Sequence, residues 1–105
     1  MKGISVVVPV FNEEGNVREL HREIVEICEK ENYNYEIIFV DDGSSDGTSR
    51  ICKELRPLKY IHMRKNFGQT AAMDAGIKAS QYDYIVTMDG DLQNDPEDIP
   101  RLVRY

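Results

Sequence analysis

The chain has 105 residues, of which 41% are hydrophobic and 30% charged, a composition typical of a single globular domain. Its formal net charge of -6 argues against nucleic-acid binding, because affinity for DNA or RNA depends on cationic side chains that neutralise phosphates. No apolar run approaches the roughly 20 residues of a transmembrane helix, and the N-terminus does not resemble a signal peptide. We therefore expect a cytoplasmic protein.

The first predicted unit is a strand, a turn and a helix. Residues 4–10 form a near-continuous β-branched run, which is typical of a strand covered on both faces of a parallel sheet. Asn12 follows the run and is a good helix N-cap. Glu13 and Glu14 suit the positive end of a helix, and apolar residues then recur at helical spacing.

The same order of strand, loop and helix then repeats. A second strand is predicted over residues 35–40 and a loop over 41–45. Asp46 is the predicted cap of the next helix, and Pro57 marks the end of that helix.

A third strand over residues 59–63 leads into an Ala-rich helix over 69–80, in which Gly76 permits close packing. A fourth strand follows over residues 82–88. Alternating strands and helices with short links predict an α/β fold, a Rossmann-like parallel sheet with helices on both faces.

The fourth strand leads into Asp89-Gly90-Asp91-Leu92-Gln93. In an extended backbone Asp89 and Asp91 point to the same side, so they can face one cation. A polar turn is the alternative interpretation, because Asp and Gly are ordinary turn residues. The tripeptide alone does not decide between them.

A further helix is predicted to begin at Asp95, with Pro100 introducing a kink. No helix stop signal precedes Tyr105, and a four-stranded sheet would keep an unpaired edge. We therefore expect residues 1–105 to be the N-terminal part of a longer protein. Self-association through the exposed edge into a homo-oligomer is a further hypothesis.

Polar residues gather at three predicted strand ends. In open α/β sheets, ligands bind outside the carboxyl ends of the strands, where the strand order reverses. Carboxylates packed together there repel one another unless a cation compensates, and Mg²⁺ or Mn²⁺ takes carboxylate, amide and phosphate oxygens together. The residues predict a metal-dependent site for a nucleoside diphosphate, with Asp89, Asp91 and Gln93 near the metal.

Simpler roles remain open for several of these residues. Asp41 and Asp42 can cap a turn, and Asn12 and Glu13 can cap a helix as readily as they can contact a ligand. Arg64 and Lys65 are either a solvated pair or a pair that faces phosphate oxygens. His21 is interpreted as a surface residue of a helix and His62 as a strand residue, whereas Cys28 and Cys52 are interpreted as reduced core residues.

Neither a Gly-x-Gly-x-x-Gly turn nor a P-loop is present, so a dinucleotide oxidoreductase and a P-loop ATPase are unsupported. Four motifs together resemble family 2 glycosyltransferases of the GT-A fold. They are residues 7–14 (VVPVFNEE), 40–48 (VDDGSSDGT), 64–68 (RKNFG) and 88–97 (MDGDLQNDPE). The pattern is most similar to the branch that transfers a sugar to a polyprenyl phosphate, such as the dolichol-phosphate mannosyltransferases and bactoprenol glucosyltransferases.

The resemblance implies a site for a UDP- or GDP-sugar. It places Asp41 or Asp42 at the base or ribose, and Asp89, Asp91 and Gln93 at the metal and diphosphate. No catalytic residue is assigned. The complete set expected to bind the nucleotide is Pro9, Phe11, Asn12, Glu13, Asp41, Asp42, Arg64 and Asp89.

The resemblance also implies that residues 1–105 are the donor-binding part of an inverting, metal-dependent transferase that lacks its acceptor half. The expected acceptor is a polyprenyl phosphate, and the expected location is the cytoplasmic face of the membrane. Residues 1–105 alone are expected to have little or no transfer activity. A sugar-nucleotide nucleotidyltransferase and a non-catalytic domain similar to phospho-receivers are the alternatives.

Overall fold

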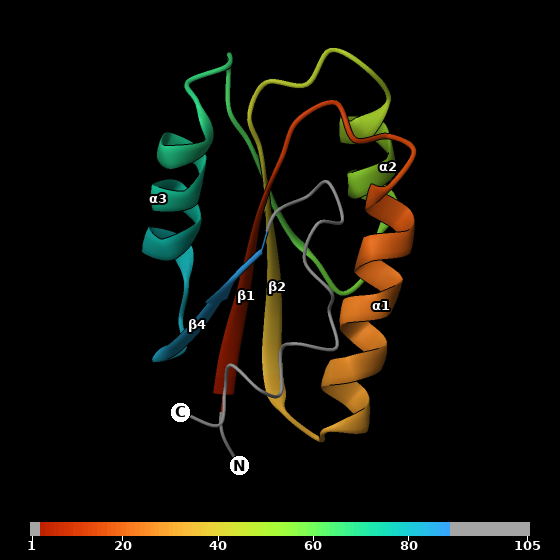
Figure 1. The fold of residues 1–105 in the computed structure, drawn as a ribbon, viewed down its shortest axis with the longest axis vertical. Coiled ribbons are helices and arrows are strands. Elements are labelled where there is room, and N and C mark those ends of the chain that lie inside the picture. Colours follow the sequence, from red (N-terminus) through yellow and green to blue (C-terminus); the bar gives the residue numbers. More distant parts are fainter. Residues whose placement is uncertain (1–2, 89–105) are drawn as a thin grey trace.

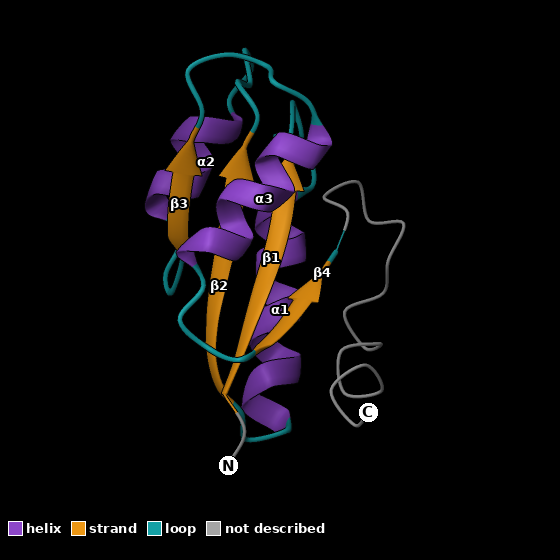
Figure 2. Ribbon diagram, turned by 90° about the vertical axis from the view of Figure 1, so that its left-hand side faces the viewer, coloured by secondary structure: helices purple, strands orange, loops and turns teal. Residues whose placement is uncertain are grey.

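The computed structural model describes residues 3–88. Four parallel strands form one sheet in the order β3-β2-β1-β4 (Figure 2). The sheet confirms the predicted α/β class. The strands are β1 (Gly3–Val10), β2 (Asn34–Asp41), β3 (Lys59–His62) and β4 (Tyr84–Thr87), and the helices are α1 (Val17–Lys30), α2 (Thr48–Glu54) and α3 (Gln69–Ala79).

The helices cover both faces of the sheet, as predicted. Figure 1 shows α1 and α2 on one side of the strands and α3 on the other. The chain moves from β1 to β2 and β3 in one direction and then crosses by α3 to β4, on the far side of β1. The strand order therefore reverses between β1 and β4, which is where this class of fold binds ligands.

The β-branched residues of β1 alternate between two cores. Ile4, Val6 and Val8 join the larger core beneath α1 and α2, while Val7 belongs to a smaller core with Ile38, Val40 and Ala72. Burial on both faces explains why this strand is apolar along its length. Within residues 3–88, none of the helices is long and apolar enough to span a bilayer.

Gly76 lets α3 approach the sheet closely, as predicted. A Cβ atom at this position would lie 2.4 Å from Cγ1 of Val7 and 3.0 Å from Cγ2 of Val40. Both neighbours are β-branched and stiff, so neither side chain can move away easily. The separation between α3 and the sheet therefore depends on the absence of a side chain here.

A polar cluster at the amino end of the sheet was not predicted. Glu36 accepts hydrogen bonds from Ser5 Oγ (2.6 Å) and from the Gln81 N–H (2.7 Å), and its other oxygen lies 3.1 Å from Lys59 Nζ. Burial alone would raise the pKa of Glu36, but these donors hold it below its usual value. The cluster therefore stabilises the fold above the unfolded carboxyl pKa of about 4.3 and loses that contribution as the pH falls through the lower folded pKa.

The interpretation of His21 as a surface residue is wrong. Its side chain is buried, Nε2 lies 2.8 Å from the Pro57 carbonyl oxygen, and its ring meets the Phe39 ring edge to face. His21 thus joins α1 to the loop before β3. The interpretation of Cys28 and Cys52 is confirmed, because both are buried free thiols whose pKa burial raises to about 12.

Replacing Gly76 with alanine should lower the free energy of unfolding by about 1–3 kcal/mol, because the added methyl group overpacks a stiff core. This loss should appear although alanine is the better helix former by about 1 kcal/mol. Urea denaturation measures it. The matched control is Gly15→Ala, where no atom lies within 4 Å of the added Cβ. Equal stability of the two variants would contradict the packing argument.

Candidate functional site

The carboxyl ends of β1 and β2 lie side by side. Val10 pairs with Asp41, and the Asp42 N–H donates to the Val10 carbonyl at 2.9 Å. On the other side of β1, the Met88 N–H donates to the Val7 carbonyl at 3.0 Å. The predicted neighbourhood of these three strands is therefore confirmed as far as Met88.

The predicted metal ligands Asp89, Asp91 and Gln93 lie outside the described residues, as does the helix predicted from Asp95. Among residues 3–88, no three His, Cys, Asp or Glu side chains lie close enough together to hold a metal ion. The predicted metal site therefore depends on residues after Met88 and stays a prediction.

The loop after β1 is bound to the loop after β2. The Asn12 N–H donates to Ser44 Oγ and the Ser45 N–H donates to Asn12 Oδ1, both at 2.8 Å. The Glu13 N–H donates to Thr48 Oγ1, also at 2.8 Å. These three hydrogen bonds fix the relative position of two segments more than thirty residues apart in the sequence.

The prediction that Asn12 caps the first helix is wrong. α1 begins at Val17 with Asn16 as its N-cap residue, and Asn12 has a φ of 51°. Asn favours both helix caps and left-handed turns, and here the turn prevails. Glu13 does contact the helix start, because its carboxylate accepts from Asn16 Nδ2 at 2.8 Å and its carbonyl accepts from the Val17 N–H at 3.0 Å.

Asp46 acts one residue earlier than a helix cap. α2 begins at Thr48 with Gly47 as its N-cap residue, and Asp46 Oδ1 accepts from the Thr48 N–H (3.0 Å) and hydroxyl (2.6 Å). Burial alone would raise the Asp46 pKa, but these donors and the Glu14 N–H keep it lowered. The predicted contact with the helix start is present in this altered form.

Asp41 is fully buried and accepts hydrogen bonds from two neighbours. Its Oδ1 accepts from the Ser44 N–H at 2.7 Å, and its Oδ2 accepts from the Tyr60 hydroxyl at 2.6 Å. His62 Nδ1 lies 2.8 Å from the same hydroxyl, on the exposed side. Burial, reinforced by the Asp41 charge, raises the pKa of Tyr60. Tyr60 has one proton, so when it donates to Asp41 the imidazole must donate to the Tyr60 oxygen.

Asp42 binds the segment that leads into α3. Its two carboxylate oxygens accept from the Phe67 N–H (2.8 Å) and the Gly68 N–H (3.0 Å). Next to it, Gly43 has a φ of 79°, and a Cβ atom there would lie 2.6 Å from the Lys65 carbonyl carbon. The loop over residues 64–68 therefore rests against the end of β2.

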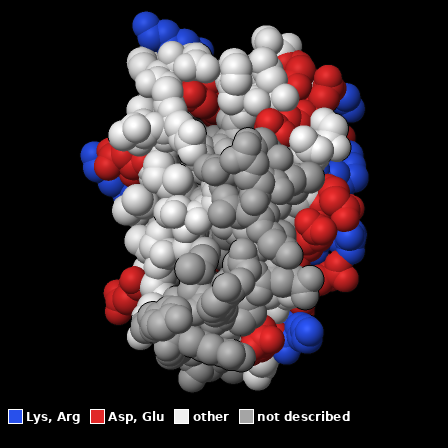
Figure 3. Space-filling view, viewed as in Figure 1, with Lys and Arg blue, Asp and Glu red and all other residues white. Residues whose placement is uncertain are grey.

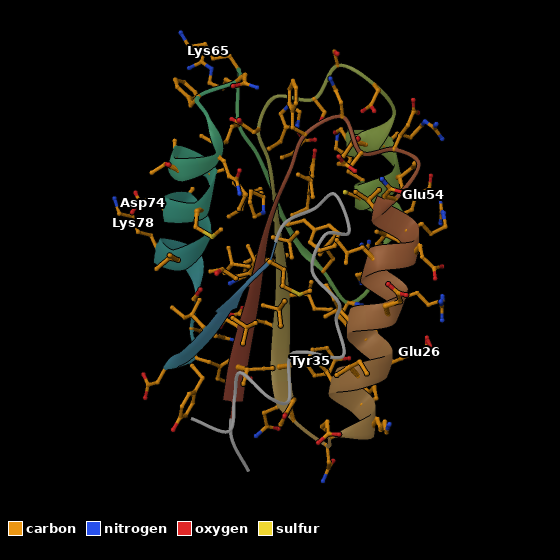
Figure 4. The ribbon with its side chains drawn as sticks, in the orientation of Figure 1. Glu26, Tyr35, Glu54, Lys65, Asp74 and Lys78 are labelled. Atoms are coloured by element: carbon orange, nitrogen blue, oxygen red, sulfur yellow. The ribbon has the colours of Figure 1, made fainter. Side chains whose placement is uncertain are left out.

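This loop carries an exposed cation and an exposed aromatic ring. Lys65 Nζ lies 5.3 Å from the centre of the Phe67 ring, and Figure 4 shows Lys65 at the extreme end of the molecule beyond α3. In Figure 3 basic atoms mark this tip, while acidic and basic side chains intermix over α1 and α2. This tip is therefore positively charged, although the chain as a whole has a net charge of -6.

The structure brings most of the described candidate residues together. Phe11 is 43% exposed at the end of β1, beside the bound loops, whereas Pro9 is buried within the strand. Arg64 is exposed after β3, two strands away from β1. Sequence reasoning missed Tyr60, although its spacing of two residues from His62 places both on one face of a strand.

The family model described as glycosyl transferase family 2 matches residues 5–105. The chain belongs to glycosyl transferase family 2. The resemblance seen in its motifs is thereby confirmed.

Curated relatives of this family 2 chain are named as polyprenyl-phosphate enzymes. A dodecaprenyl-phosphate galacturonate synthase from Rhizobium johnstonii is 45% identical over 105 residues, covering 95% of this chain and 31% of the relative. An undecaprenyl-phosphate 4-deoxy-4-formamido-L-arabinose transferase from Aeromonas hydrophila is 39% identical over 108 residues, covering 98% of this chain and 33% of the relative. The chain thus spans about a third of the length of these relatives.

Solved structures confirm the fold. A glucosyl-3-phosphoglycerate synthase from Mycobacterium tuberculosis, in complex with Mn²⁺, UDP and glucosyl-3-phosphoglycerate, superposes with a TM-score of 0.80 at 24% identity, covering 98% of this chain and 39% of that one. A mannosyltransferase from Pyrobaculum calidifontis, in complex with GDP-Man and Mn²⁺, superposes with a TM-score of 0.75 at 25% identity. The match covers 90% of this chain and 29% of that one. The fold of the family 2 chain is therefore the predicted GT-A type.

Replacing Asp42 with alanine should release the 64–68 loop, because two backbone N–H groups lose their acceptor. Each unsatisfied donor costs about 1–3 kcal/mol where it is buried. Hydrogen exchange of the Phe67 and Gly68 amides should accelerate at least tenfold, a factor that corresponds to about 1.4 kcal/mol. Asp74→Ala is the control, because that exposed residue pairs with Lys78 on the outer face of α3 (Figure 4). Unchanged exchange in Asp42→Ala would contradict the conclusion that Asp42 holds the 64–68 loop in place.

Proposed function

We propose that residues 1–105 are the nucleotide-sugar-binding part of a metal-dependent, inverting family 2 glycosyltransferase that uses a UDP- or GDP-sugar. One observation carries the proposal: the family match over residues 5–105 coincides with a carboxyl edge whose loops are held in fixed positions. That edge lies where the strand order reverses, the usual ligand position in this class of fold.

Phe11 and Asp42 are the described residues best suited to the nucleoside. The exposed ring of Phe11 offers a flat apolar face to a base. Each carboxylate oxygen of Asp42 accepts one hydrogen bond from the 64–68 loop. An ionised carboxylate has about four lone pairs that can accept hydrogen bonds. It can therefore still accept from a base or ribose donor. Asp41 is fully buried and serves as the support behind it.

Asp89, Asp91 and Gln93 would hold Mg²⁺ or Mn²⁺ at the end of β4. Such a cation neutralises the charge of a leaving nucleoside diphosphate. The complexes of the Mycobacterium tuberculosis and Pyrobaculum calidifontis proteins contain Mn²⁺ together with a nucleotide, which supports this part of the proposal. Arg64, on the loop that Asp42 binds, is a further candidate for donor contact.

The acceptor we propose is a polyprenyl phosphate, because the two curated relatives carry such an acceptor in their names. Its binding site would lie in the part of those relatives that this chain does not match. We accordingly place the complete enzyme at the cytoplasmic face of a membrane. No observation favours the nucleotidyltransferase or the receiver-like alternative.

Calorimetric titration should detect binding of UDP or GDP that is strengthened by Mn²⁺. Asp91→Asn should weaken the Mn²⁺-supported binding at least tenfold, about 1.4 kcal/mol, because an amide cannot supply the charge of a carboxylate ligand. The matched control is Asp83→Asn, the same substitution just before β4, at the opposite end of that strand.

Equal losses in the two variants would contradict a metal site at Asp91. Binding of neither nucleotide by the full-length protein, with or without Mn²⁺, would contradict the donor site itself.

A further inference from the structure

We infer that Asn12 and Ser44 are positioning residues, which hold Phe11 and the β1–α1 loop in the conformation that receives the nucleotide. Asn12 was expected to contact the nucleotide itself. The inference rests on the proposed function, and it assigns to these two residues an indirect part in donor binding.

The two residues form a reciprocal contact between loops. The Asn12 N–H donates to Ser44 Oγ, and Asn12 Oδ1 accepts from the N–H of Ser45, each at 2.8 Å. Both the backbone donor and the side-chain acceptor of Asn12 are thus already used within the protein. The side-chain groups that would be left for a ligand are the amide Nδ2 and the second lone pair of Oδ1.

The backbone conformation of Asn12 changes the direction of the chain at this contact. Its φ of 51° is left-handed, a conformation that costs most L-residues about 1–2 kcal/mol and that Asn tolerates better than most. The chain changes direction here, immediately after Phe11, which is 43% exposed. The left-handed turn therefore lies directly beside the exposed Phe11, and the contact with Ser44 and Ser45 keeps the turn in place.

A neighbouring hydrogen bond holds the residue that follows Asn12. The Glu13 N–H donates to the hydroxyl of Thr48, a fully buried residue at the start of α2. The segment from Phe11 to Glu13 is consequently fixed to the second loop, and the Glu13 carbonyl also accepts from the N–H of Val17, the first residue of α1. A loop that is ordered before binding spares the ligand the entropy cost of ordering it.

The Asn12→Asp variant distinguishes a positioning role of Asn12 from direct contact between Asn12 and the nucleotide. Aspartate keeps the side-chain acceptor for the Ser45 N–H and also tolerates a left-handed backbone. It loses the Nδ2 donor and adds a negative charge, both of which harm a direct contact with a nucleoside diphosphate. Asn12→Ala removes the acceptor, and Ser44→Ala removes the acceptor for the Asn12 N–H.

The experiment measures the Kd of the full-length protein for UDP and GDP with Mn²⁺, at a temperature where unfolding curves show every variant to be folded. Asn12→Ala should weaken binding about tenfold, Ser44→Ala should weaken it several-fold, and Asn12→Asp should stay within about threefold of the wild type. The double variant Asn12→Ala/Ser44→Ala should bind no worse than about twofold below Asn12→Ala, because each substitution breaks one of the two hydrogen bonds of the same contact between loops.

Gly76→Ala is the matched control, because it destabilises the packing of α3 without touching either loop. Its Kd should equal that of the wild type, which shows that lost stability alone does not weaken binding. If Asn12→Asp binds as poorly as Asn12→Ala, or if the two alanine effects multiply, the positioning role is overturned. A wild type that binds neither nucleotide overturns the proposed function instead, so the two failures can be told apart.

Discussion

The carboxylates of Asp41 and Asp42 are the groups on which the carboxyl edge of the sheet depends. Both are buried, and a buried carboxylate is tolerated only where donors surround it. Asp41 takes its donors from the loop after β2 and from Tyr60 of β3, while Asp42 takes them from the segment before α3. The cost of burying these charges therefore orders three separate segments around one strand end.

This arrangement gives the two halves of the proposed site different physical characters. At the ends of β1 and β2, aspartates, serines and backbone amides satisfy one another and present Phe11 at a rigid rim. At the end of β4, by contrast, the carboxylates predicted to bind the metal follow directly in the sequence. A nucleotide bound across the reversal of strand order would place its base on the preordered side and its diphosphate toward the proposed cation.

The sequence predicted those features that depend on local patterns, and it failed where distant residues decide. The β-branched run of β1, the two aspartates at the end of β2 and the small residue in α3 were all visible as patterns and are confirmed. The conformation of Asn12 was not, because Asn suits a cap and a left-handed turn equally, and contacts with Ser44 and Ser45 favour the turn. His21 was misplaced because its partner, the Pro57 carbonyl, lies 36 residues away. No local pattern carries that information.

The most direct measurement is an NMR titration of the isotope-labelled protein with UDP or GDP in the presence of Mg²⁺, following every backbone amide. Binding at the carboxyl edge predicts that the largest shifts fall in residues 11–13, 42–45, 64–68 and 89–93, with little change around Ser5, Glu36 and Gln81 at the opposite end. Shifts that cluster at that opposite end, or along the exposed face of α1, would contradict a donor site at the carboxyl edge.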